Sequence, residues 1–170
     1  VSLSNSNKNI QLKMKTFVSK VTKDKKVILY FWNMSNFNQI IQSNIPTLVD
    51  FYATWCGPCK LLDKKTFANK DLALYVSEHF YAVKFNAEGK DEVVFPNKTY
   101  KNSGRSHELA LELLDNKMSY PTVVYLDKTF AKIQAIPGYR TETDFLKISK
   151  FMGEEIYKKQ TLELTYKWIV

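Results

Sequence analysis

Two cysteines three residues apart constrain this chain more than any other feature of its sequence. Cys56 and Cys59 lie in WCGPCK, residues 55–60, and they are the only cysteines among 170 residues. On the first turn of a helix, side chains three apart share one face, at a Cα separation that a disulfide tolerates. The unpaired N–H groups and positive dipole end of a helix N-terminus favour a thiolate over a thiol. The spacing therefore supplies an attacking thiolate and a resolving thiol, the minimum for thiol–disulfide exchange.

The residues around the motif predict a strand, a turn and a helix. VDFYAT, residues 49–54, is a short apolar run rich in β-forming residues and predicts a buried strand. In KLLDKKTF, residues 60–67, apolar and charged residues alternate with the spacing of a helix. Gly57 allows a tight turn, and Pro58 suits the first helical turn because its missing N–H costs nothing there. The cysteines would then lie at the carboxyl end of a strand, where α/β folds bind and react.

Other uses of the cysteine pair fit the sequence less well. A zinc site needs four ligands, and the only histidines, His79 and His107, match no finger spacing. Covalent haem would need a histidine where Lys60 stands. A purely structural disulfide remains an alternative, although it would close a loop too short to remove much unfolded-state entropy. We expect no metal and no bound cofactor, the redox group being the Cys56–Cys59 disulfide itself.

The net charge of +8 comes almost entirely from lysine, since Arg105 and Arg140 are the only arginines. The lysines are scattered, whereas a nucleic-acid interface would need an arginine-bearing stripe with interleaved aromatic residues. We therefore expect a basic surface and no nucleic-acid partner. No run approaches the roughly 18 apolar residues that span a bilayer, so we expect no stable membrane insertion of this chain.

The first residues bear on the cellular compartment. The chain opens at Val1 with the polar stretch VSLSNSNKN and has no initiator methionine. That is typical of a chain whose secretory signal was removed, although a cloning choice would look the same. The absence of a third cysteine suits an oxidising compartment, where stray thiols mispair. We expect a periplasmic or otherwise exported protein, with the cytoplasm as the alternative.

Apolar periodicity along the chain predicts an α/β fold, with one mixed sheet and helices on both of its faces. We expect one domain over residues 27–152, an N-terminal extension over residues 1–26, and a tail over residues 153–170. The tail carries a short helical pattern from Thr161. The chain contains no internal repeat.

Residues 87–118 are predicted to be an insertion, with a polar loop followed by a helix that is capped near Ser103 or Ser106. That helix would present Leu109, Leu113 and neighbouring apolar residues on one face. The other predicted strands are near residues 14–21 and at 27–32, 49–54, 80–88, 122–127 and 130–136, and the other predicted helices are at 37–41, 60–67, 69–79 and 141–151.

These motifs resemble those of the thioredoxin superfamily. VDFYATWCGPCK, residues 49–60, is close to the signature of that family, and SYPT, residues 119–122, resembles its cis-proline loop. The resemblance covers about residues 27–152 and implies the thioredoxin fold. Within the superfamily, the chain resembles the exported branch, which includes the C-terminal domain of the thiol:disulfide interchange protein DsbD. Those relatives have a long segment between the CxxC motif and the cis-proline, and here 65 positions separate Cys56 from Pro121 (121 − 56).

The resemblance implies four catalytic residues. Cys56 would attack a client disulfide and Cys59 would resolve the mixed disulfide. Asp50 would accept the proton of the resolving thiol, and burial would raise its pKa towards neutrality. Lys84 would lie beside this acid. The alternatives are a surface position for Asp50 and a lysine that merely extends from a strand into solvent for Lys84.

The resemblance also implies a docking groove for clients. Pro121 would be the cis-proline whose preceding backbone pairs with an extended substrate segment. For Trp55 the alternative is a core position. The residues that would line the groove are Trp55, Gly57, Pro58, Tyr120, Pro121, Gly138 and Tyr139.

The implied function is a monomeric thiol:disulfide oxidoreductase that reduces disulfide-containing client proteins and is itself reduced by an upstream thiol. One residue departs from the thioredoxin pattern: Tyr120 precedes Pro121, and Tyr-Pro is more familiar from protein disulfide isomerases. Disulfide isomerase or oxidase activity is therefore an alternative. A third alternative is a binding or assembly module that acts through the insertion and the tail.

Overall fold

The structure, a computed structural model, describes residues 44–95 and 98–162 of the chain. Within this part, four strands form a central sheet in the order β2-β1-β5-β6. Strand β1 runs parallel to β2 and antiparallel to β5, which is also antiparallel to β6, so the sheet is mixed. The strands are β1 (Thr47–Tyr52), β2 (Tyr81–Asn86), β5 (Thr122–Leu126) and β6 (Lys132–Pro137).

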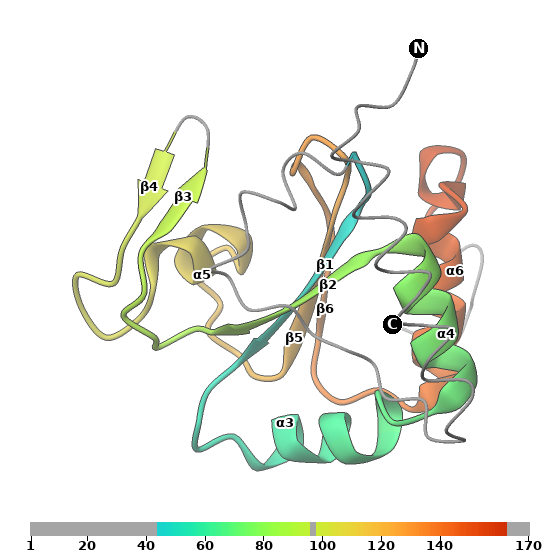
Figure 1. The fold of residues 1–170 in the computed structure, drawn as a ribbon, viewed down its shortest axis with the longest axis horizontal. Helices are drawn as coiled ribbons and strands as arrows, with labels where there is room; N and C mark the ends of the chain where they lie inside the picture. Colours follow the sequence, from blue (N-terminus) through green and yellow to red (C-terminus); the bar gives the residue numbers. More distant parts are fainter. Residues whose placement is uncertain (1–43, 96–97, 163–170) are drawn as a thin grey trace.

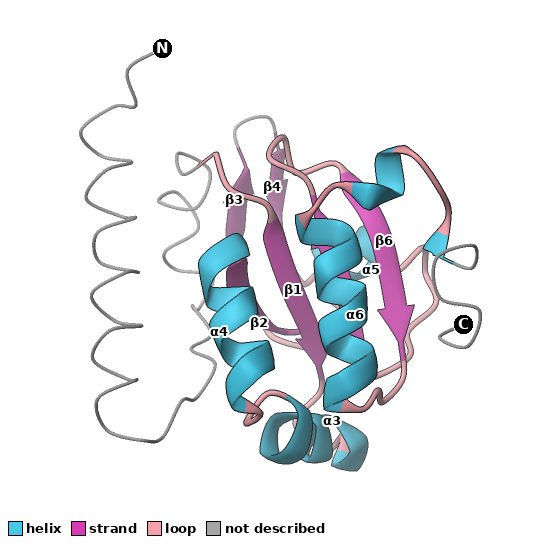
Figure 2. Ribbon diagram, turned by 90° about the vertical axis from the view of Figure 1, so that its right-hand side faces the viewer, coloured by secondary structure: helices cyan, strands magenta, loops and turns pink. Residues whose placement is uncertain are grey.

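Helices cover both faces of this sheet (Figures 1 and 2). Helices α4 (Lys70–His79) and α6 (Glu142–Gly153) lie side by side on one face, and the short α5 (Glu108–Leu113) lies on the other. Alternate side chains of β1 pack into the cores on the two faces of the sheet, because successive residues of a strand point to opposite faces. Leu48 packs into the core under α4 and α6, whereas Val49 packs into the core under α5. The predicted α/β fold is confirmed.

The cysteine motif follows β1 directly. Helix α3 (Gly57–Leu61) continues into the π-helical turn η2 (Leu62–Thr66), in which the N–H of Phe67 donates to the carbonyl of Leu62 at 3.0 Å. Figure 1 shows α3 at the end of the sheet where β1 finishes. The predicted order of strand, turn and helix is therefore confirmed.

The insertion differs from its prediction in two respects. A hairpin of β3 (Val93–Phe95) and β4 (Lys98–Tyr100) stands where a polar loop was expected, because Val93 and Tyr100 bury their side chains in the core beside α5. Helix α5 is capped by His107, whose ring Nδ1 accepts the N–H of Leu109 at 3.2 Å. The cap therefore lies one residue after Ser106, near which it was predicted, because histidine, which is not among the usual N-cap residues, takes that role here.

The C-terminal half agrees closely with its prediction. Strands β5 and β6 form the expected hairpin, whose turn is held by the carboxylate of Asp127. Thr141 caps α6 through its Oγ1, which accepts the N–H of Asp144 at 3.2 Å. A 3-10 turn, η3 (Ile156–Lys158), follows α6. No helix among the described residues is both long and apolar enough to cross a bilayer.

Several predictions fall outside the described residues. The strands near 14–21 and at 27–32, the helix at 37–41 and the tail beyond residue 162 are among them. The proposed domain limits of 27 and 152 stay a prediction.

Candidate active site

The two cysteines form a disulfide with a Cα–Cα distance of 5.4 Å. Each is only 2% exposed. Cys56 is the N-cap residue of α3, and its Sγ accepts the N–H of Cys59 at 3.1 Å. When the disulfide is reduced, this N–H and the positive end of the helix are placed to stabilise a thiolate on Cys56.

Asp50 lies in the middle of β1 and is fully buried. Within the described structure neither of its carboxylate oxygens has a hydrogen-bond partner. The ammonium of Lys84, on the neighbouring strand, lies 3.3 Å from Asp50 Oδ2 and forms an ion pair with it. Burial raises the pKa of Asp50 to about 6, and Lys84 only partly opposes this rise. The carboxyl can therefore change its protonation state near neutral pH, as a proton acceptor must.

The ammonium of Lys84 contacts a second carboxylate, that of Asp63 in η2. It also lies over the ring of Tyr52, at 5.2 Å from the ring centroid. Lys84 thus joins the buried Asp50 to the partly exposed Asp63, and the surface alternatives for Asp50 and Lys84 are wrong. The sequence analysis missed Asp63. Its position four residues after Cys59, on the same side of one continuous helical segment, is the signal that could have found it.

Asp63→Asn is expected to lower the pKa of Asp50. The Asp63 carboxylate raises that pKa and also shares the ammonium of Lys84, so both effects of its removal have the same sign. An NMR titration of the side-chain carboxyl carbon of Asp50 measures the change. Glu78→Gln removes an equal charge from an exposed position on α4 and should leave the titration midpoint of Asp50 unchanged. An unchanged titration in Asp63→Asn would show that Asp63 does not act on Asp50.

Two aromatic side chains form a rim beside the disulfide. Tyr120 packs against the buried cluster of Ala53, Cys56 and Cys59. The ring of Trp55 meets the ring of Tyr120 edge to face, with 6.0 Å between centroids. Trp55 is 68% exposed, so it is not a core residue. Its indole N–H donates to both carboxylate oxygens of Glu88, at 3.2 and 3.1 Å.

The loop before β5 holds Tyr120 in this position. The peptide bond between Tyr120 and Pro121 is cis. The carbonyl of Pro121 accepts the N–H of Gly138 at 2.7 Å, and Gly138 has a φ of +81°, in the left-handed region that favours glycine. The loop is thus tied to the end of β6.

Three other predicted groove residues, Gly57, Pro58 and Tyr139, do not pack against the cysteine cluster. Gly57 and Pro58 are exposed on the first turn of α3. Gly57 does not have a positive φ, and a Cβ there would contact nothing within 4 Å, so the turn does not require glycine. Tyr139 packs against the core under α4 and α6 rather than with the cysteine cluster.

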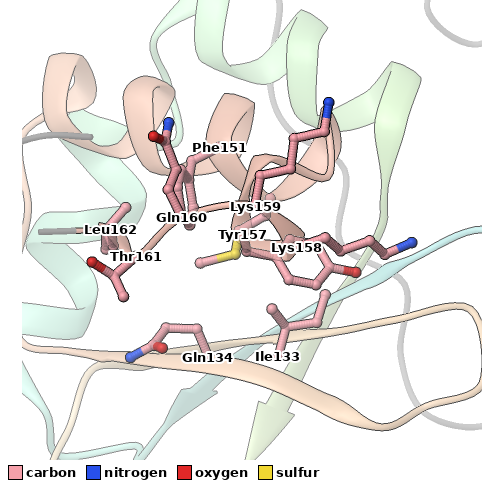
Figure 3. Close-up of a pocket in the computed structure, with 10 residues that line it drawn as sticks. Ile133, Gln134, Phe151, Tyr157, Lys158, Lys159, Gln160, Thr161 and Leu162 are labelled. Atoms are coloured by element: carbon pink, nitrogen blue, oxygen red, sulfur yellow. The ribbon is translucent and has the colours of Figure 1, made fainter. Parts of the chain in front are cut away.

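A hollow of about 540 Å³ lies between β6 and the chain that follows α6 (Figure 3). Side chains such as Ile133, Phe151 and Tyr157 line it. None of the predicted site residues does. Among the described residues, no group of three or more His, Cys, Asp or Glu side chains is arranged to hold a metal ion.

A model of the thioredoxin-like domain family matches residues 34–153, which is more than half of the chain. The chain belongs to this family. The predicted thioredoxin fold is therefore confirmed for this thioredoxin-like protein. A thioredoxin-fold protein from Helicobacter pylori is 28% identical, with a TM-score of 0.57 over 73% of this chain and 80% of that chain.

Curated relatives agree with this assignment. Thioredoxin C-3 of Corynebacterium nephridii is 28% identical over 128 residues, which cover 75% of this chain and 69% of that protein. Mitochondrial Thioredoxin-3 of Saccharomyces cerevisiae is 50% identical over 30 residues, which cover 18% of this chain and 24% of that protein. The chain thus spans about a quarter of the length of several curated thioredoxins that it matches.

The C-terminal domain of Neisseria meningitidis DsbD is 18% identical, with a TM-score of 0.45 over 71% of this chain and 97% of that chain. A similarity at this level does not assign the thioredoxin-like protein to one branch of the superfamily. The family and the Cys56–Cys59 disulfide together support a thiol–disulfide oxidoreductase.

Proposed function

We propose that this thioredoxin-like protein reduces disulfides of client proteins. The observation that carries the proposal is the Cys56–Cys59 disulfide, at the start of a helix whose continuation is joined through Lys84 to the buried Asp50. A purely structural disulfide needs no buried carboxyl joined to its helix. A buried carboxyl whose pKa is raised to about 6 is costly to the fold and is suited to proton transfer.

The reaction would proceed in two exchanges. The thiolate of Cys56 attacks one sulfur of the client disulfide, the client S–S bond breaks, and the released client sulfur takes a proton from solvent. The Cys59 thiol then gives its proton to Asp50 and attacks Cys56 Sγ, which releases the second client sulfur as a thiolate. The client gains two electrons and the protein ends with the disulfide of this structure. An upstream thiol reductant must return those two electrons.

The rim suits an extended client segment. Trp55 and Tyr120 present aromatic surface next to the buried cysteines, and the backbone before Pro121 would pair with the client as an added strand. Cys56 and Cys59 are each only 2% exposed, so a client must dock closely before its sulfur can reach Cys56.

The direction of the reaction separates this proposal from an isomerase or oxidase. Tyr120 packs against the disulfide and is the observation that favours the alternative. Equilibration with glutathione buffers should give a midpoint below about −225 mV, on the thioredoxin side of the interval between thioredoxin (about −270 mV) and protein disulfide isomerase (about −180 mV). A midpoint above that value, together with recovery of activity from scrambled ribonuclease, would establish the alternative.

A further inference from the structure

Within the insertion, the side chain of Asn102 binds the turn whose residue Glu88 contacts the active-site rim. Its amide Nδ2 donates to two successive carbonyls, those of Glu88 at 3.1 Å and Gly89 at 2.8 Å. Its Oδ1 accepts the N–H of Gly104 at 3.0 Å. Asn102 therefore clamps the turn that follows β2, and that turn carries Glu88.

The clamp itself is held in place by the start of α5. The carboxylate of Glu108 accepts the N–H of Lys101 at 3.1 Å and the hydroxyl of Ser103 at 3.0 Å, on either side of Asn102. The N–H of His107 donates to the carbonyl of Ala87 at 2.8 Å. Residues 101–108 are thus tied both to α5 and to the end of β2.

Glu88 connects this turn to the rim. Its backbone N–H donates to Asn86 Oδ1 at 3.1 Å, and its carboxylate accepts the indole N–H of Trp55. Trp55 in turn meets Tyr120, whose pKa is raised by burial first and then by the Glu88 carboxylate. A continuous series of contacts therefore runs from the insertion to the residue that precedes the cis-proline.

We propose that the insertion sets the position of Trp55 through Asn102 and Glu88, which makes Asn102 a positioning residue for the binding of protein clients. The inference rests on the proposed function for its substrate class. Trp55 is 68% exposed, and among residues 44–95 and 98–162 the hydrogen bonds to Glu88 and the ring contact with Tyr120 order its ring. A ring that is ordered before docking loses less conformational freedom when a client binds. A small disulfide makes little contact with the rim and does not depend on this ordering.

Asn102→Ala tests the inference by its different effects on large and small substrates. The KM for insulin should rise about threefold to tenfold, the range expected for losing one hydrogen-bonded contact, while kcat changes little. The rate constant for oxidation of the reduced protein by bis(2-hydroxyethyl) disulfide, which is small and uncharged, should stay at the wild-type value. Thr129→Ala is the matched control, because it removes a side-chain hydrogen bond from a different exposed turn, that between β5 and β6, and leaves the contacts of residues 88, 89 and 101–108 unchanged.

The indole N–H resonance of Trp55, assigned with Trp55→Phe, gives a readout that needs no catalysis. It should move away from its carboxylate-bonded position in Asn102→Ala, and adding Asn102→Ala to Glu88→Ala should cause no further shift. Asn102→Asp is a second test in case Asn102→Ala folds poorly. It keeps the acceptor for the N–H of Gly104 but cannot donate to the two carbonyls, so it should shift the indole resonance in the same way.

An unmoved indole resonance in both Asn102 variants, or equal losses with insulin and the small disulfide, would overturn the inference. Wild-type protein that does not reduce insulin at all would instead contradict the proposed function, and the indole resonance would still decide the role of Asn102.

Discussion

Asp50→Asn is expected to make the protein more stable at pH 8 by about 2 kcal/mol. A pKa raised from 3.8 to about 6 means that ionising the buried carboxyl costs the folded state about 3 kcal/mol. Asparagine removes that cost. Its buried amide donors have no partners, however, which lowers the gain in the free energy of unfolding by about 1 kcal/mol. Denaturant unfolding of the oxidised proteins measures the difference.

The pH dependence of this stabilisation follows from the sign of the shift. Below pH 3.8 the Asp50 carboxyl is protonated in both the folded and the unfolded state, and the wild type bears no penalty. As the pH rises through 6 the folded state must ionise a group that the unfolded state has already ionised, so the wild type loses stability. The variant should therefore gain its advantage between pH 4 and pH 7. Glu78→Gln should show no such pH-dependent gain, and a variant that is less stable than wild type at pH 8 would show that the ion pair with Lys84 dominates.

The same substitution should slow catalysis. Without the Asp50 carboxylate, the Cys59 thiol loses its proton acceptor, and resolution of the mixed disulfide should fall about a hundredfold at pH 7, the low end of what a general base supplies. A variant that is more stable and less active indicates that Asp50 is present for chemistry rather than for the fold.

Replacing either cysteine should abolish turnover. Cys56→Ser removes the attacking sulfur, so insulin reduction should fall to the rate of dithiothreitol alone. Cys59→Ser leaves an attacking thiolate on Cys56 but no sulfur to resolve the mixed disulfide, which then waits for dithiothreitol, so the rate should fall close to that of dithiothreitol alone. Rates of insulin precipitation at fixed dithiothreitol measure both effects. Turnover that survives either substitution would leave the disulfide as a structural link, the alternative that the sequence alone permits.

Local features of this protein could be predicted from its sequence, because they depend on patterns within a few residues. The strand that ends at Tyr52, the helix after Cys56 and the cap at Thr141 follow from apolar runs and capping chemistry. Features that depend on contacts between distant segments could not. The β3–β4 hairpin has strands of only three residues, and the buried positions among those whose burial is described are Val93 and Tyr100, which pair with each other.

The residues of the candidate site also divide into those that local sequence predicts and those that depend on contacts between distant segments. Cys56, Cys59 and Asp50 stand at recognisable spacings, and the structure places all three in or beside one strand and helix. Asp63 and Glu88 were missed because each acquires its partner, Lys84 or Trp55, only when strands and turns from other parts of the chain come together. The resemblance implied a groove position for Tyr139, but its side chain packs against the core under α4 and α6.

Capture of clients by Cys59→Ser is the most direct measurement of the central claim. The account predicts that the variant, incubated with oxidised client proteins under non-reducing conditions, forms mixed disulfides through Cys56 that dithiothreitol releases. Cys56→Ser and the double serine variant should capture nothing. Equal capture by Cys56→Ser, or no capture by Cys59→Ser, would contradict a mechanism in which Cys56 is the attacking thiol.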